Sequence, residues 1–336
     1  MRGSALHERL PLGQRGLSTQ LGSPLLCQNT RRPGLKRVGK VAALAGLVAL
    51  LATGCSGDEV LRFGWPVGVT EQADKMRWLW TWSVVAALVV GVIVWGLIFW
   101  SSAFHRKKKN ADPTDLPRQF QYNVPLELFL VITPLVMVCV LFFFTATTES
   151  QVLDKKPNPD VTVNVIGFQW NWEFDYPNEA KDATGQTIKT VGSSSEIPLL
   201  VVPVGKTIQY NVRSTDVIHS FWVPEFHFKR DVFPYPEKNN QDASFQNTID
   251  RPGSFVGRCA ELCGPYHSMM NFEVRALPQN LYAQYIQLRT QINPATGVPN
   301  TAAEALAAMN CGELCTPHAV TTEPFNTNRT ARTASG

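Results

Sequence analysis

The amino-acid sequence predicts two transmembrane helices followed by an all-β sandwich and a short helical C-terminal extension. Two apolar runs, residues 78–100 and 126–148, are each long enough to cross about 30 Å of hydrocarbon as a helix. From Val161 onward, apolar and polar residues alternate, which is typical of half-buried strands. The chain of 336 residues therefore divides into a membrane part and a part outside the membrane.

The N-terminal segment has the features of a secretory signal peptide. The first 40 residues hold eight basic and one acidic residue, whereas the rest of the chain holds 23 basic and 26 acidic residues. The positive net charge therefore belongs to this segment and does not indicate nucleic-acid binding. The apolar run at 41–52 is too short to span a membrane, and small residues lead from it to Cys55. We expect residues 1–54 to be removed. Cys55 resembles the acylated cysteine of a bacterial lipoprotein, but Ala52 stands where leucine is usual, so simple cleavage is the alternative.

The two apolar runs predict membrane spans at residues 78–101 and 126–148. Tryptophans stand at both ends of the first run, as is common at membrane interfaces. The connecting segment, 102–125, contains the basic cluster His105-Arg-Lys-Lys-Lys109. Because short basic loops stay in the cytoplasm, both ends of the mature chain face outward. Residues 55–77 then form an outer N-terminal segment.

The outer domain, residues 155–276, is predicted to be a β-sandwich. Apolar residues alternate in one phase from Val161 and in the opposite phase from Phe168, and the change at Gly167 predicts a β-bulge or a bend. Short strands without a long helix favour a sandwich. Further strands are predicted at residues 199–204, 207–212, 217–223, 254–259 and 271–276.

Sulfur and nitrogen ligands gather near the end of this domain. Cys259, Cys263, His267 and Met270 lie close together, and His219 lies upstream in an apolar strand. Thiolate and thioether ligands favour copper, whereas structural zinc sites do not use methionine. The alternative is a disulfide between the two cysteines, with ordinary histidines and a packing methionine.

The pattern of His219 followed by Cys-x3-Cys-x3-His-x2-Met resembles the dinuclear CuA copper centre in subunit II of haem-copper cytochrome c oxidases. The segment Gln169-Trp-Asn-Trp172 and the two preceding spans match the same family. This resemblance implies a cupredoxin-like sandwich that holds two copper ions. It makes Cys259 and Cys263 the bridging ligands.

The resemblance also assigns the remaining copper ligands. It gives His219 and Met270 to one ion, and His267 together with the backbone carbonyl of Glu261 to the other. Met269 does not keep the family spacing and is expected to serve packing. The carboxylate of Glu261 would help to hold a Mg²⁺ shared with subunit I, or it is a solvated acid.

Two further side chains take a role from the resemblance. Trp170 would be the exposed tryptophan that receives electrons from the donor, although a tryptophan in an alternating strand is ordinarily a core residue, as we expect for Trp172. Glu127, seven residues before Pro134, would stand at the entrance of a proton channel of subunit I. From its position alone, Glu127 would be a polar residue at the membrane interface.

The resemblance implies subunit II of an aa3-type cytochrome c oxidase in a bacterial plasma membrane, with no nucleic-acid partner.

 Such a subunit passes electrons from a c-type cytochrome to the haem and copper of subunit I, which reduces O₂ to water and pumps protons. The implied partners are subunits I and III, membrane lipid, and a c-type cytochrome that is either soluble or part of a bc1-type complex. A quinol-oxidase subunit II would lack the Cys and His ligands. A free-standing membrane-anchored copper carrier would not need Glu127, Trp170 or the Glu261 carboxylate.

Two segments depart from the family pattern. Residues 224–259 are longer than expected, which predicts an extra surface loop. Residues 277–336 form an extension with predicted helices at 281–292 and 301–309. Near its end, Cys311, Cys315 and His318 imitate the copper motif, but the histidine comes one residue early and no methionine follows. We therefore favour a local disulfide over free thiols or a second metal site.

Overall fold

The computed structural model describes residues 46, 56–106, 112, 114, 116, 119–238 and 240–324. The chain divides into two units, Met1–Cys55 and Ser56–Gly336, and every element below belongs to the second unit. The predicted signal peptide (1–54), the lipidation site Cys55 and most of the basic loop lie outside the described residues.

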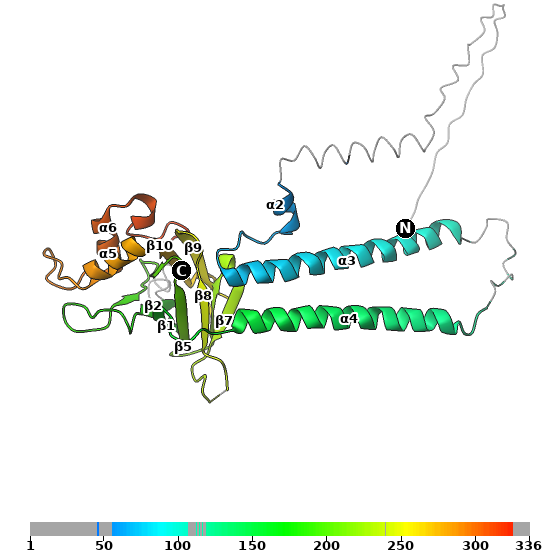
Figure 1. Cartoon of the computed structure of the whole chain (residues 1–336), viewed down its shortest axis with the longest axis horizontal. Coiled ribbons are helices and arrows are strands. Elements are labelled where there is room, and N and C mark those ends of the chain that lie inside the picture. The colour runs from blue at the N-terminus through cyan, green and yellow to red at the C-terminus, as the bar shows by residue number, and fades with distance from the viewer. Residues whose placement is uncertain are drawn as a thin grey trace, which may run out of the picture. The chain divides into compact units, whose positions relative to one another are not determined.

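Two long apolar helices, α3 (Glu71–Phe104) and α4 (Val124–Leu153), run side by side (Figure 1). Both are long and apolar enough to cross a membrane, and the most apolar stretch of each is not buried within the chain. Their first turns are capped by side chains: Thr70 Oγ1 accepts from Ala73 N at 3.0 Å, and Asn123 Oδ1 accepts from Leu126 N at 3.4 Å. A short helix, α2 (Gly57–Leu61), precedes them.

Both long helices extend beyond the predicted spans at their outer ends, because those turns pack against the β domain. Ala73 in α3 and Val152 in α4 are buried. Val69, just before α3, donates its N–H to the carbonyl of Glu225 at 3.0 Å. These buried side chains and this hydrogen bond attach the helices to the β domain.

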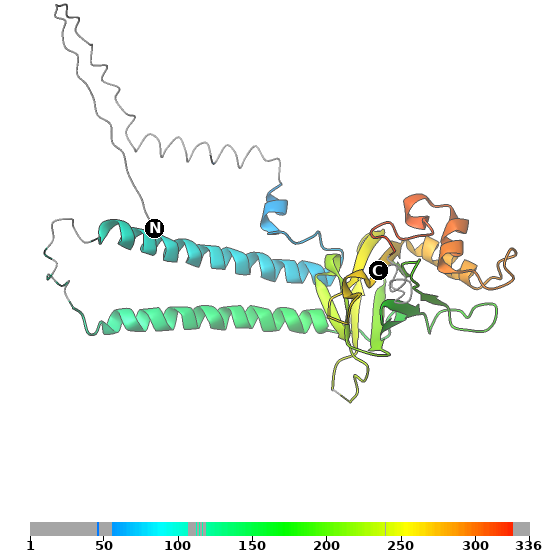
Figure 2. The ribbon, with the colours of Figure 1, turned by 180° about the vertical axis from the view of Figure 1, so that it is seen from behind.

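The β domain is a sandwich of two five-stranded sheets, as the sequence predicts (Figures 1 and 2). One sheet has the order β3-β2-β1-β5-β8, and the other has the order β4-β10-β9-β6-β7. The strands are β1 (Val161–Phe168), β2 (Asn171–Asp175), β3 (Lys189–Val191), β4 (Leu199–Pro203), β5 (Thr207–Ser214), β6 (His219–Val223), β7 (Phe228–Val232), β8 (Ser244–Thr248), β9 (Gly253–Cys259) and β10 (Asn271–Leu277). The pairs β1–β5 and β4–β10 are parallel, whereas the others are antiparallel.

Aromatic side chains fill the core between the sheets. Trp172, Phe221 and Phe272 are buried, and the Phe272 ring lies 5.3 Å from Trp172 and 4.6 Å from Phe221, centroid to centroid. Such ring pairs contribute about 0.5–1.5 kcal/mol each beyond their burial. Trp172 Nε1 also donates to the carbonyl of Met270 at 3.3 Å, which ties the core to the predicted copper ligands.

The alternation of apolar and polar residues changes phase at Gly167 because of a tight hairpin rather than a bulge. Gly167 pairs with Trp172, and Phe168 pairs with Asn171, so residues 169–170 form a two-residue turn between β1 and β2. A Cβ on Gly167 would lie 2.9 Å from Cδ2 of His219. Glycine is therefore required here because the ring of His219 packs against the backbone.

The extra surface loop expected within residues 224–259 lies between β7 and β8. The same segment also contains β7 and β8, each at the edge of one sheet, and the whole of β9. The sequence of β8, Ser-Phe-Gln-Asn-Thr, is mostly polar, so its strand signal is weak. The short strand β3 was also not predicted, because it is largely exposed.

The extension folds into helices α5 (Gln279–Arg289) and α6 (Ala302–Met309), followed by a 3₁₀ turn, η3 (Gly312–Cys315). Cys311 and Cys315 form a disulfide, which confirms the predicted local bond. Beneath this segment, Glu273 and Arg275 of β10 form a fully buried ion pair. The motif that imitates the copper ligands therefore belongs to a structural extension.

Backbone groups of the extension satisfy the buried ion pair. Arg275 Nη1 donates to the carbonyl of Leu314 at 2.8 Å and to that of Thr316 at 3.1 Å. Glu273 Oε2 accepts from the N–H groups of Val320 and Thr321 at 2.7 and 2.8 Å. The charged pair thus holds the end of the extension on the sheet that contains β10.

We predict that Arg275→Ala lowers the free energy of unfolding by about 3–5 kcal/mol, because it leaves the Glu273 carboxylate buried without its partner. Arg258→Ala, which removes an exposed arginine from the adjacent strand β9, is the matched control and should change stability by less than about 0.5 kcal/mol. Denaturant unfolding of the full chain in detergent measures both values. Equal losses in the two variants would contradict the docking role of Arg275.

Candidate metal centre

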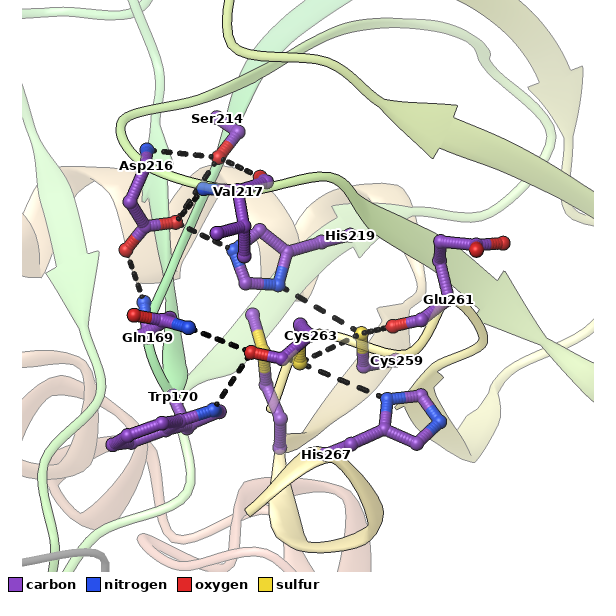
Figure 3. Close-up of polar contacts among 11 residues, drawn as sticks. Gln169, Trp170, Ser214, Asp216, Val217, His219, Cys259, Glu261, Cys263 and His267 are labelled. Carbon is purple, nitrogen blue, oxygen red and sulfur yellow. Dashed lines mark hydrogen bonds and ion pairs between the residues drawn. The ribbon is translucent and has the colours of Figure 1, made fainter. Parts of the chain in front are cut away.

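The sulfur and imidazole groups singled out from the sequence lie close together (Figure 3). His219 is the first residue of β6, and Cys259 is the last residue of β9. These two strands are antiparallel neighbours, with Phe221 paired to Cys259. Cys263 lies in the loop after β9, which also supplies the remaining donors.

The donor atoms lie at the spacing of ligands around a shared site. The two Sγ atoms are 3.7 Å apart, and His219 Nδ1 lies 3.9 Å from Cys259 Sγ. His267 Nδ1 and Met270 Sδ lie 3.7 and 3.8 Å from Cys263 Sγ. The carbonyl oxygen of Glu261 lies 3.3 Å from Cys259 Sγ. The sequence-predicted ligand set is therefore brought together as a whole.

These distances fit metal coordination better than a disulfide. Metal–ligand bonds of about 2.0–2.3 Å in tetrahedral geometry place neighbouring ligand atoms about 3.3–3.8 Å apart. A disulfide would require the two sulfurs to approach to about 2.05 Å, and Cys259 and Cys263 are free thiols. Two thiols, a thioether and two imidazoles form a soft donor set, which suits copper.

Burial keeps water away from most of the donors. His219 and Met270 are completely buried, and Cys259 and Cys263 are nearly so. His267 is half-buried, so one side of the cluster lies close to the surface. The rigid strands and the buried donors leave little room for the ligands to move.

The protonation of the two thiols is coupled. The hydrogen bond between the two side chains lowers the pKa of Cys259, and the same interaction raises the pKa of Cys263. One thiolate is therefore readily available near neutral pH, while the second thiol must release its proton to a metal.

Asp216 orients His219 from the side opposite the sulfurs. One carboxylate oxygen, Oδ1, lies 2.8 Å from His219 Nε2 and accepts from Val217 N at 2.7 Å, while Oδ2 accepts from Gln169 N at 2.7 Å. Burial raises the pKa of Asp216, but these hydrogen bonds outweigh it and the pKa is lowered. Asp216 was not among the predicted site residues, although an acid three residues before a candidate ligand was a usable signal.

Trp170 lies beside the cluster but is not exposed in the described chain. Its exposed fraction is 7 %, because its ring packs edge-on against Tyr266 with centroids 4.8 Å apart. Trp170 Nε1 donates to the carbonyl of Cys263 at 3.1 Å. The expectation of an exposed tryptophan is therefore wrong for this structure, whereas Trp172 is a core residue as expected.

The side chains of the other predicted residues lie outside the cluster. The side chain of Glu261 is half-buried, and Met269 is 38 % exposed, so Met269 is not the packing residue that the sequence suggested. Glu127 lies in the first turn of α4, where its Oε1 accepts from Asn123 N at 3.0 Å. That contact caps the helix, at the end of α4 farther from the sandwich (Figure 1).

Comparison with known proteins gives one consistent family. Residues 161–277 match the family described as cytochrome C oxidase subunit II, periplasmic domain. A probable cytochrome c oxidase subunit 2 of Nocardia farcinica is 46 % identical, over 90 % of this chain and 91 % of its own length. Cytochrome c oxidase subunit 2 of Mycobacterium tuberculosis is 44 % identical, over 88 % and 90 %.

A solved structure is also similar in part. It is the periplasmic domain of subunit II of cytochrome oxidase of Bradyrhizobium japonicum, which is 28 % identical and has a TM-score of 0.33. The match covers 39 % of this chain and 94 % of that chain.

We predict that Gly167→Ala weakens copper binding by about 10-fold, the lower end of the range for changes next to metal ligands. The added methyl group would press on the ring of His219 at 2.9 Å. Gly57→Ala is the control, because a Cβ there meets nothing within 4 Å. Competition with a chromophoric copper chelator measures the affinity. Equal affinity in both variants would show that the glycine does not place the histidine.

Proposed function

Because the chain belongs to the cytochrome c oxidase subunit II family, we propose that it is the electron-accepting subunit of an aa3-type oxidase with a CuA centre. It takes electrons from a c-type cytochrome and passes them to the haem and copper of subunit I, where O₂ is reduced to water with proton pumping. The observation that carries this proposal is the convergence of two thiols, two imidazoles, a thioether and a carbonyl in one buried cluster.

The chain's own residues would hold two copper ions. Cys259 and Cys263 would contribute to holding both ions, His219 and Met270 would hold one of them, and His267 with the carbonyl of Glu261 would hold the other. The soft donors and the 3.7 Å separation of the two Sγ atoms support this assignment. When bound, the centre supplies one-electron redox chemistry.

The protein supplies rigidity and exclusion of water rather than a reacting group. His219 and Cys259 are fixed by the pairing of β6 with β9, and Cys259 N donates to the carbonyl of Met270 at 3.0 Å. Asp216 fixes the ring of His219 through Nε2. Ligands that do not move on a change of redox state favour rapid electron transfer, and the potential is set by the ligands and their hydrogen bonds.

Trp170 is our candidate for the residue through which electrons arrive. Its indole is hydrogen-bonded to the backbone of Cys263, which supports a direct link from the donor side to a copper ligand. The donor is a c-type cytochrome, either soluble or within a bc1-type complex. Trp170 is buried in the isolated chain, and the donor would need to dock close to it.

The remaining sites complete the proposed role in the oxidase. The carboxylate of Glu261 would share a Mg²⁺ with subunit I, and Glu127 would stand at a proton channel of that subunit. Subunits I and III would cover α3 and α4, whose apolar stretches are unburied in the isolated chain, together with membrane lipid. The β domain would lie on the outer face of the plasma membrane, with Cys55 as the lipid anchor.

We predict that the full chain, reconstituted in detergent, binds two copper ions and becomes purple with a mixed-valence electron spin resonance signal. Cys263→Ser should abolish that signal because it removes a bridging thiolate. Cys315→Ser should leave it intact because Cys315 belongs to the disulfide of the extension. One copper ion per chain with a blue-type spectrum would refute the CuA assignment.

We predict that Glu127→Gln lowers oxidase turnover by about 10-fold in the assembled complex, if the carboxyl group carries protons. Glutamine keeps an oxygen that can accept the hydrogen bond from Asn123 N, so the helix cap is retained. Oxygen consumption by the purified complex measures the effect. Unchanged turnover would leave Glu127 as a capping residue only.

A further inference from the structure

We propose that Gln169 is a positioning residue for electron transfer, which holds Trp170 against the backbone of the copper ligand Cys263. This inference rests on the proposed function and deepens it. The two residues form the turn between β1 and β2, and both side chains donate to the same carbonyl oxygen (Figure 3). Gln169 Nε2 lies 2.7 Å from the oxygen of Cys263, and Trp170 Nε1 lies 3.1 Å from it.

The shared carbonyl fixes the indole relative to the metal ligand. A carbonyl oxygen has two lone pairs, and here each can accept one of the two donors. The peptide of Cys263 cannot rotate without weakening both hydrogen bonds. Removal of the amide of Gln169 would take away one of these two hydrogen bonds, so the contact between Trp170 and Cys263 would become more variable.

Gly264 provides the space for both donors. Its φ angle of +124° lies in a region that residues other than glycine rarely adopt. A Cβ at this position would lie 3.1 Å from Trp170 Nε1 and 3.3 Å from Gln169 Nε2. The backbone of the loop that contains Cys263 and Gly264 is therefore shaped to receive the two side chains.

The turn is also tied to the other end of the metal cluster. Gln169 N donates to Asp216 Oδ2 at 2.7 Å, and Asp216 Oδ1 lies 2.8 Å from His219 Nε2. Gln169 thus contacts Cys263 through its side chain and, by way of Asp216, His219 through its backbone. This double attachment distinguishes Gln169 from an ordinary turn residue.

The test is Gln169→Leu in the full chain, which removes the amide donor at similar volume. Gln279→Leu is the matched control, because Gln279 Nε2 also donates to a backbone carbonyl, that of Val204, at 3.2 Å. Rapid-mixing kinetics with a soluble c-type cytochrome separate the docking constant from the electron-transfer rate within the complex. We expect the rate within the complex to fall about 10-fold, with the docking constant and the copper spectrum unchanged. The control should change none of these.

A second measurement does not depend on copper. In the metal-free chain with ¹⁵N-labelled tryptophan, Gln169→Leu should accelerate hydrogen exchange at the indole N–H of Trp170. In the same metal-free chain, the changes in the free energy of unfolding caused by Gln169→Leu and Trp170→Phe should be non-additive in the double variant, because both changes act on the carbonyl of Cys263. If the Leu variant does not load copper, Gln169→Asn, which shortens the side chain by one methylene group, repeats the comparison.

Three results would overturn the inference. They are an unchanged rate with unchanged exchange, a loss confined to the docking constant, and a loss of the copper spectrum in both Gln169 variants. The second result would make Gln169 a donor contact, and the third would make it a support of the metal site itself. If the unaltered copper-loaded chain accepts no electrons from the cytochrome, the proposed function fails instead.

Discussion

The antiparallel pairing of β6 with β9 is the interaction on which the candidate metal centre depends. It brings His219 within 3.9 Å of Cys259, although the two residues are 40 positions apart in the chain. The N–H of Ala260 donates to the carbonyl of Ser220 at 3.0 Å, so the pairing continues to the start of the loop that follows β9. A shift of one residue in this register would turn His219 to the opposite face of the sheet and separate it from the sulfurs.

The rest of the sandwich supports this pair of strands from three sides. The β1–β2 turn holds the loop that contains Cys263, and Gly167 of β1 leaves room for the His219 ring. The strand β10 follows directly after Met270, and the C-terminal extension holds that strand through the buried Glu273–Arg275 pair. The packing of Val69 and Ala73 on the β domain connects the site to the membrane helices. Parts of the chain that are distant in sequence therefore hold the candidate ligands in place.

The ligand set could be predicted because the sequence pattern resembles that of a known family, and ligands that are close in sequence stay close together in a loop. The two apolar helices and the alternation of β1 were similarly clear. The burial of Trp170 could not be predicted, because it depends on the tertiary contact with Tyr266. The role of Asp216 could not be predicted either, because it depends on the direction of the His219 ring. The strands β7 and β8 could not be predicted because they form by pairing with neighbouring strands rather than from their own composition.

The central claim is that the cluster binds two copper ions through shared thiolates. X-ray absorption of the copper-loaded full chain tests it most directly, because it reports the atoms around each metal. The account predicts two sulfur neighbours per copper at about 2.3 Å, a nitrogen neighbour, and a second copper within the same shell of scatterers. A spectrum with a single sulfur neighbour and no copper–copper contribution would contradict it.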